Sequence, residues 1–132
     1  MSKKSSDSVS LNDLQEKVAK FRDERNWKQH HNPKNLVISI LVEAAELAEH
    51  FQWESMAKAL GHRKNPAKKE KIAAELADVI IYCLSLADIM GIDSTAAIID
   101  KLRHNREKFP RDKVNDLGFI RRQREKYRRL RK

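Results

Sequence analysis

Apolar residues recur every three or four positions through most of the chain, which is the period of an α-helix with one buried face. Ser10 with Asp13 three residues later predicts an N-cap pair that opens a first helix. The apolar stripe of that helix comprises Leu11, Leu14, Val18 and Phe21. No alternating strand pattern and no Gly-rich phosphate loop accompanies the helical period.

The dipeptide Asn-Pro occurs twice, and each time it predicts a helix start, with Asn as the N-cap and Pro as the first helical residue. The first copy, Asn32-Pro33, opens a helix that we expect to run to about Trp53. A linker containing Gly61 follows. The second copy, Asn65-Pro66, opens a helix that should end near Gly91, a natural residue just past a helix C-terminus.

A fourth helix is predicted after Asp93-Ser94, and it should stop before Phe109-Pro110 because a residue before proline disfavours the helical conformation. The fold class expected is therefore all-α, an antiparallel four-helix-bundle-like arrangement with helices two and three supplying the core. Three parts are expected along the chain: a disordered lead over residues 1–9, one domain over 10–110, and a basic C-terminal tail over 111–132.

The charge of the chain is concentrated at its C-terminal end. Residues 111–132 hold ten Lys/Arg against three Asp/Glu, so the other 110 residues carry only +2 of the total +9. Phe119, Ile120, Tyr127 and Leu130 offer a thin apolar stripe, too weak for an independently stable helix, so we expect the tail to be mobile or docked on a neighbouring subunit.

A single cysteine, Cys83, and no apolar stretch of membrane-spanning length favour a cytoplasmic protein without a disulfide framework or membrane partner.

Two pairs of carboxylates interrupt the two most apolar helices. Glu43 and Glu46 form one pair, and Glu75 and Asp78 form the other. Residues three apart lie side by side on a helix, and apolar flanks turn such faces inward. Four carboxylates facing one another repel, so a cation should lie between them. Oxygen-only ligands favour Mg²⁺, with Mn²⁺ as the alternative.

Two other interpretations of these carboxylates are weighed against the metal site. Each pair taken alone fits a solvated helix face. A di-iron site would need Glu-x-x-His on two helices, whereas Glu49 follows Glu46 and Asp78 follows Glu75. Glu49 adjoins the acidic face and is a candidate base for an attacking water, although an exposed structural Glu is the commoner role.

Aromatic and polar residues extend each acidic face. The spacing places His50 and Trp53 beyond Glu46, and Tyr82 beyond Asp78. Trp53 is a candidate wall for a nucleotide base or, as plausibly, an ordinary core residue. Candidate contacts for phosphate oxygens are Lys101 and Asn105 on one face of the fourth helix, and His31 in the turn before the second helix.

At this point the chain resembles a known family, the all-α MazG-like nucleoside triphosphate pyrophosphohydrolases, and within it the dCTP pyrophosphatase group. The resemblance covers about residues 11–110 and includes Glu43-x-x-Glu46, then twenty-eight residues, then Glu75-x-x-Asp78. The other matching runs are Phe21-Arg-Asp-Glu-Arg-Asn-Trp27, His31-Asn-Pro-Lys-Asn-Leu36, Glu43-Ala-Ala-Glu-Leu-Ala-Glu-His-Phe-Gln-Trp53, Glu75-Leu-Ala-Asp-Val-Ile-Ile-Tyr82 and Lys101-Leu-Arg-His-Asn105-Arg-Glu-Lys-Phe-Pro110.

The resemblance implies cleavage of a dNTP to dNMP and pyrophosphate, with Mg²⁺ held by the four carboxylates. It also implies Trp27 and Trp53 as walls of a base pocket, and a homo-oligomer, a dimer or dimer of dimers, with sites built across subunit contacts. The sugar and phosphate contacts that it implies are Tyr82, Lys101 and Asn105. Val18 departs from the group, which has a His at that place in the base pocket, and this weakens the case for dCTP itself.

Three functions therefore compete. The first is a nucleotide pyrophosphohydrolase that removes surplus or modified dNTPs. The second is a nucleic-acid-binding helical module acting through the basic tail, with its arginines at 121, 122, 124, 128, 129 and 131. The third is an inactive helical interaction protein. The complete set of carboxylates argues against the third, and the near-neutral body argues against the second as the main activity.

Overall fold

The computed structural model describes residues 9–130, and every regular element among them is helical. The all-α prediction is therefore confirmed. Residues up to Ser94 form one compact unit and residues from Thr95 onward form a second. Among the described residues, no helix has both the length and the apolar character that crossing a bilayer requires. The α-helices are α1 (Leu11–Glu24), α2 (Pro33–Glu49), α3 (Met56–Gly61), α4 (Pro66–Ile89), α5 (Ser94–Lys108) and α6 (Leu117–Arg129), and the 3₁₀ turns are η2 (Lys28–His30), η3 (His62–Lys64) and η4 (Arg111–Lys113).

Helix α1 begins where the sequence predicts. The Ser10 hydroxyl accepts a hydrogen bond from the backbone N–H of Asp13 at 3.1 Å, and the Asp13 carboxylate accepts one from the backbone N–H of Ser10 at 2.7 Å. This reciprocal capping box satisfies two N–H groups that a helix start would otherwise leave unpaired. The predicted disordered lead over 1–9 falls almost wholly on residues 1–8, which lie outside the described residues.

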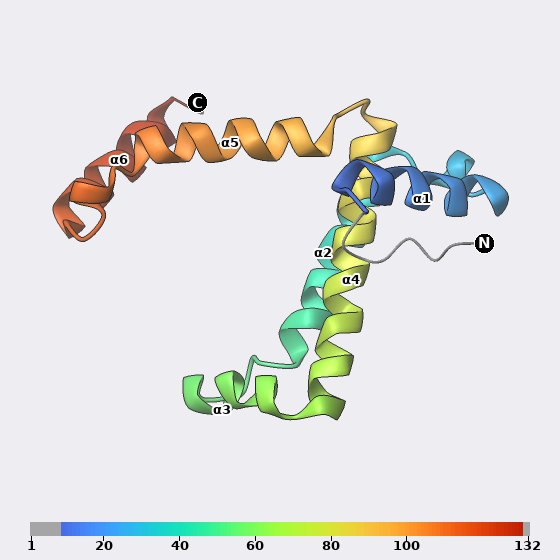
Figure 1. Ribbon diagram of the computed structural model, residues 1–132, viewed down its shortest axis with the longest axis horizontal. Helices are drawn as coiled ribbons and strands as arrows, with labels where there is room; N and C mark the ends of the chain where they lie inside the picture. The colour runs from blue at the N-terminus through green and yellow to red at the C-terminus, as the bar shows by residue number, and fades with distance from the viewer. Residues whose placement is uncertain (1–8, 131–132) are drawn as a thin grey trace. The chain divides into compact units, whose positions relative to one another are not determined.

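Both Asn-Pro helix starts are also confirmed. The Asn32 side chain accepts from the N–H of Asn35 at 2.9 Å, and the Asn65 side chain accepts from the N–H of Lys68 at 3.1 Å. The two long helices that follow, α2 and α4, lie side by side in the first unit, and α1 packs against α4 (Figure 1). Leu36 of α2 and Leu84 of α4 are its two buried apolar residues among those described.

Helix α2 ends at Glu49, one turn earlier than expected, and the prediction that it runs to about Trp53 is wrong. Residues 51–54 form a turn, after which Ser55 caps the short helix α3 by accepting from the N–H of Lys58 at 3.3 Å. The segment around Gly61, expected to be a linker, is therefore α3 followed by a 3₁₀ turn. Glu54 is held at this point by its side-chain contact with His62.

Helix α4 ends at Ile89, and Gly91 follows in the left-handed region with φ of 65°, as its position in the sequence predicts. A glycine adopts this conformation without the steric cost that a Cβ would bring. The next helix, α5, starts at Ser94 and ends at Lys108, before Phe109-Pro110, which confirms the predicted stop.

The C-terminal segment is more ordered than its sequence predicts. Residues Leu117–Arg129 form α6, with Asp116 as N-cap accepting from the N–H of Phe119 at 2.9 Å. The Tyr127 ring lies 5.6 Å from the His104 ring of α5, edge to face, and α6 folds back along α5 (Figure 1). The sequence analysis took this stripe as too weak for an independently stable helix and expected a mobile tail or one docked on a neighbouring subunit, whereas the structure shows a helix that contacts α5 within the second unit. Residues 131–132 are outside the description.

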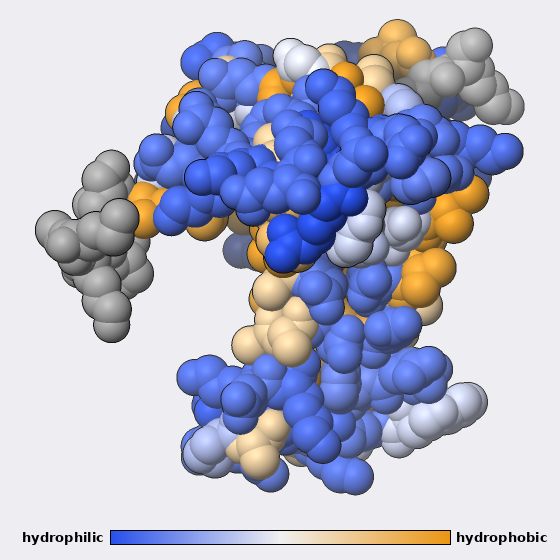
Figure 2. Space-filling model, turned by 90° about the vertical axis from the view of Figure 1, so that its right-hand side faces the viewer, coloured by the Kyte–Doolittle hydropathy of each residue, from blue (hydrophilic) through white to orange (hydrophobic). Residues whose placement is uncertain are grey.

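Much of the apolar surface of α2 and α4 stays uncovered in a single chain. Leu41 of α2 is 65 % exposed and Leu76 of α4 is 47 % exposed. Figure 2 shows apolar patches breaking the hydrophilic surface of the molecule. The remaining exposed apolar residues on these two helices are Val37, Ile38, Val42, Ile80 and Ile81.

Candidate metal and nucleotide site

Three of the predicted metal ligands meet between α2 and α4. Glu43 from α2 and Glu75 and Asp78 from α4 each offer a carboxylate oxygen, and these oxygens all lie within 4.8 Å of one another. The arrangement follows from the packing of the two helices, because the i,i+3 pair on α4 faces the middle of α2. A set of carboxylate oxygens at this spacing suits a hard divalent cation.

The electrostatics of this acidic cluster, defined as Glu43, Glu75 and Asp78, are unfavourable without a cation. Burial raises the pKa of Glu43 above its ordinary value of 4.5, and the negative charges of Glu46, Asp78 and Glu75 raise it further. Glu43 and Glu75 are half-buried and Asp78 is exposed, so the cluster is open to solvent on one side. An approaching ligand or ion can therefore enter without disturbing the helices.

The fourth predicted ligand and the predicted base lie beside the cluster. Glu46 is exposed one turn beyond Glu43, and its charge is the largest electrostatic influence on the pKa of Glu43 after burial. Its carboxylate is not within the 4.8 Å group. Glu49 is exposed at the last residue of α2.

Aromatic rings gather at the other side of the cluster, where α2 begins. The His31 ring lies 6.2 Å from the Trp27 ring and 6.4 Å from the Tyr82 ring, measured between centroids. Tyr82 stands one turn past Asp78 on α4, so this aromatic group continues the acidic face as the sequence predicts. Trp27, His31 and Tyr82 are thus brought together by the fold.

The surroundings of His31 disfavour its protonated form. Burial lowers its pKa below 6.5, and the positive charges of Arg22 and His30 lower it further. Its Nδ1 atom is buried without a hydrogen-bond partner among the described residues. A neutral imidazole with an unpaired nitrogen can bond to a ligand on this side of the site.

Two arginines that support this region, Arg22 and Arg25, have no signal in the sequence analysis. Phe21 meets Trp27 edge to face at 5.8 Å, and the Arg25 guanidinium lies 3.5 Å from the centre of the Phe21 ring. Arg22 is almost fully buried, and its guanidinium pairs with Asp88 of α4 at 2.6 Å. Only tertiary packing reveals these contacts, since nothing in the local sequence of α1 marks which arginine turns inward.

Trp53 does not join the aromatic group. Its side chain is 90 % exposed in the turn after α2, so the interpretation as an ordinary core residue does not hold for the single chain. Trp27 precedes α2 and Trp53 follows it, and a helix of 17 residues is about 25 Å long. The two tryptophans therefore lie at opposite ends of α2.

The remaining predicted residues divide between the two units. His50, predicted to extend the acidic face, instead contacts the Lys68 ammonium through Nδ1 at 3.1 Å. Val18 on α1 is half-buried. Lys101 is exposed and Asn105 half-buried, four residues apart on α5 in the second unit.

The sequence of this region matches a known family. Residues 38–118, which include all four predicted ligands, match the sequence profile of the MazG-like family. The chain belongs to the MazG-like family. The resemblance stated from the sequence alone is therefore confirmed.

Similar proteins place this MazG-like chain near the dCTP pyrophosphatase group. It is 38 % identical over 100 residues to dCTP pyrophosphatase 1 of Rattus norvegicus and 35 % identical to that of Homo sapiens, covering 76 % of this chain. The matched segment spans 59 % of the length of these curated relatives. A crystal structure of a pyrophosphatase from Archaeoglobus fulgidus is similar with a TM-score of 0.69 and 37 % identity, covering 76 % of this chain and 93 % of that one.

Proposed function

We propose that this MazG-like protein is a Mg²⁺-dependent nucleoside triphosphate pyrophosphohydrolase that cleaves a dNTP, dCTP-like or modified, to dNMP and pyrophosphate. The observation that carries the proposal is the meeting of Glu43, Glu75 and Asp78 within 4.8 Å between two helices. The names of the similar proteins, dCTP pyrophosphatase 1 and a pyrophosphatase, support the reaction and the substrate class. The function would be removal of unwanted nucleotides from the cytoplasmic pool.

The chemistry suits these residues. Glu43, Glu46, Glu75 and Asp78 would hold the metal, with Mn²⁺ as the alternative ion. A divalent ion bound there would neutralise phosphate charge and polarise an attacking water. Glu49, at the end of α2, would accept the proton of that water, and no protein nucleophile is required. Lys101 and Asn105 would contact phosphate oxygens as a point charge and an amide donor.

The base pocket in this proposal is completed by a second copy of the chain. Trp27, His31 and Tyr82 form one aromatic wall near the start of α2, while Trp53 lies beyond its end. The two walls can meet at one base only if Trp53 comes from another subunit. The exposed apolar positions of α2 and α4 favour such a homo-oligomer, a dimer or a dimer of dimers, because burying them stabilises the assembly.

The test is a panel of the four standard dNTPs and several modified dNTPs, assayed with Mg²⁺ for pyrophosphate and for orthophosphate. Pyrophosphate release is expected from wild type and from Glu70→Gln, an exposed carboxylate on α4 outside the acidic cluster. Glu75→Gln, the same change five residues further along α4, should abolish turnover. Orthophosphate as the product, or full activity in Glu75→Gln, would overturn the proposal.

A further inference from the structure

The net charge of the chain resides wholly in the second unit. Residues 95–132 hold fourteen Lys/Arg against five Asp/Glu, a net +9, whereas residues 1–94 hold fourteen of each and are neutral. Of these cations only Lys101 has a role in the function proposed above, and the acidic cluster itself lies on α2 and α4. The richest part is α6, with six Lys/Arg and one Glu in 13 residues.

Helix α6 has two distinct faces. Its half-buried residues, among those described, are confined to one side, and they are Phe119, Ile120, Gln123 and Tyr127. At about 100° per residue these four fall within an arc of roughly 100°. The Tyr127 ring meets His104 at 5.6 Å, and the Lys108 ammonium lies 3.9 Å from the centre of that ring. The apolar face is therefore occupied inside the second unit.

The opposite face is cationic and loosely paired. Arg121 lies 3.8 Å from Glu125, and Arg122 lies 3.9 Å from Asp116, which are long distances for exposed ion pairs. Such pairs contribute little and exchange easily for another anion. Within residues 9–130 no carboxylate pairs with the other four cations of α6, which are Arg124, Lys126, Arg128 and Arg129.

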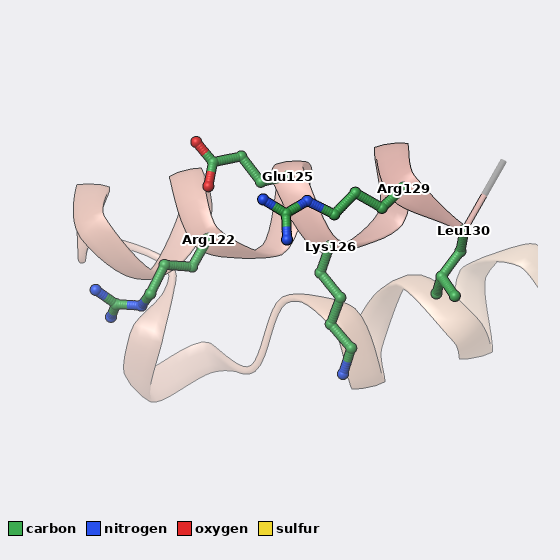
Figure 3. Close-up of a pocket in the computed structure, with 5 residues that line it drawn as sticks. All are labelled: Arg122, Glu125, Lys126, Arg129 and Leu130. Atoms are coloured by element: carbon green, nitrogen blue, oxygen red, sulfur yellow. The ribbon is translucent and has the colours of Figure 1, made fainter. Parts of the chain in front are cut away.

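Shallow grooves run beside these cations. One groove of about 410 Å³ lies along α6, and Figure 3 shows Glu125 pointing away from the chain segment below the helix while Lys126 and Leu130 point toward it. Its lining residues are Arg122, Glu125, Lys126, Arg129 and Leu130. Another of about 200 Å³ is lined by Lys108 of α5 together with Arg124, Tyr127 and Arg128. Arginine guanidinium groups bind phosphate oxygens with two parallel hydrogen bonds, so these grooves fit phosphodiesters.

We propose that α6 binds the phosphate backbone of nucleic acid without regard to sequence, as a second binding site separate from the acidic cluster. A chain of evenly spaced phosphates matches cations that follow one another along about two and a half turns of helix. A membrane fits less well, because an interfacial helix inserts its apolar face, and here Tyr127 of that face contacts His104 and Lys108 of α5. The inference does not depend on the reaction proposed above.

The test is fluorescence anisotropy of labelled single-stranded RNA, single-stranded DNA and duplex DNA of about 20 nucleotides, titrated with the full chain between about 50 and 300 mM KCl. The logarithm of the association constant should fall linearly with the logarithm of the salt concentration, with a slope of about −0.9 per phosphate contact for duplex DNA and about −0.7 for single strands. Free dNTP and vesicles of anionic lipid serve as separate arms that distinguish the other sources of phosphate.

Matched variants assign the binding to α6. Arg124→Gln with Arg128→Gln should cut the slope by about 1.4 to 1.8 and lower affinity at least about tenfold near 100 mM salt. Lys17→Gln with Lys20→Gln removes the same charge from exposed positions of α1 and should change neither. Arg124→Lys with Arg128→Lys keeps the charge and should retain most of the slope.

Several results would overturn the proposal. One is an equal loss of affinity in the α6 and α1 variants. Another is a loss of affinity in Arg124→Lys with Arg128→Lys (the lysine pair) as large as in Arg124→Gln with Arg128→Gln (the glutamine pair). A third is no nucleic-acid binding by wild type near 50 mM salt. Binding to vesicles in the absence of any binding to nucleic acid would point instead to a membrane. Circular dichroism of each variant must match wild type, and the lysine pair keeps the test decisive if the glutamine pair loses helix.

Discussion

Glu43→Gln should stabilise the metal-free protein. The substitution keeps the size of the side chain and removes one of three carboxylates whose oxygens lie within 4.8 Å of one another. At that distance each repulsion is about 1 kcal/mol in water and about 3.5 kcal/mol at an effective dielectric of 20. Because Asp78 is exposed, the lower figure applies, and relief of two such contacts is worth about 1–2 kcal/mol.

The expected readout is the melting temperature. A gain of about 1–2 kcal/mol raises Tm by roughly 3–8 °C for a chain of this size. Scanning fluorimetry in EDTA should show this increase for Glu43→Gln and no increase for Glu70→Gln, which lies outside the cluster on α4. On addition of Mg²⁺ the order should reverse, because wild type gains binding energy that Glu43→Gln has lost with its ligand.

The pH dependence follows from the raised pKa of Glu43. The unfolded chain loses this proton near 4.5, and the folded chain loses it at a higher pH. The protonated Glu43 carboxyl therefore contributes its full share to the free energy of unfolding below pH 4.5, and this contribution is lost as the pH rises through the raised pKa of the folded chain. Wild type in EDTA should lose stability over that interval and Glu43→Gln should not. An unchanged Tm in EDTA, with an unchanged response to Mg²⁺, would refute the repulsion argument.

Three further outcomes are expected. Trp53→Ala should raise KM for the best dNTP, because the loss of base stacking weakens substrate binding by about 1–3 kcal/mol. The urea midpoint should stay nearly unchanged, because the ring is 90 % exposed in the single chain. A large fall in stability with a normal KM would contradict the role of Trp53 in the base pocket. Asp88→Ala should lower the free energy of unfolding in urea by about 3 kcal/mol, since it leaves the buried Arg22 guanidinium without its partner on α4. A loss below about 1 kcal/mol would show that the ion pair with Asp23 alone compensates the charge of Arg22. Gly91→Ala should cost about 1 kcal/mol in the same assay because of its φ of 65°, and no loss would show that the turn relaxes.

Local signals predicted the starts of α1, α2 and α4 correctly because each is set by a few neighbouring residues, whereas the starts of α3 and α6 were not predicted. Ser10 with Asp13, and the two asparagines before proline, form their caps within three residues along the chain. The end of α2 had no such signal, since neither Gly nor Pro follows Glu49. The stop there coincides with the Ser55 cap of α3 and the contact of Glu54 with His62, the second of which is tertiary.

The candidate site was predictable only as far as helical spacing reaches. The i,i+3 pairs placed Glu75 and Asp78 together, and the fold then brought Glu43 to them. The separation of Trp27 from Trp53 depends on where α2 ends and on how the turn before it packs, and helical spacing determines neither. Likewise α6 owes its order to contacts of Tyr127 with His104 and Lys108, which propensity alone does not include.

The most direct test of the central claim is ³¹P NMR of a dNTP incubated with the full chain, with Mg²⁺ and then with EDTA. We expect dNMP and pyrophosphate with Mg²⁺, no products with EDTA, and no products from Asp78→Asn under either condition. Formation of dNDP and orthophosphate, or equal turnover in EDTA, would contradict the assignment of Glu43, Glu75 and Asp78 as the metal-binding centre of a pyrophosphohydrolase.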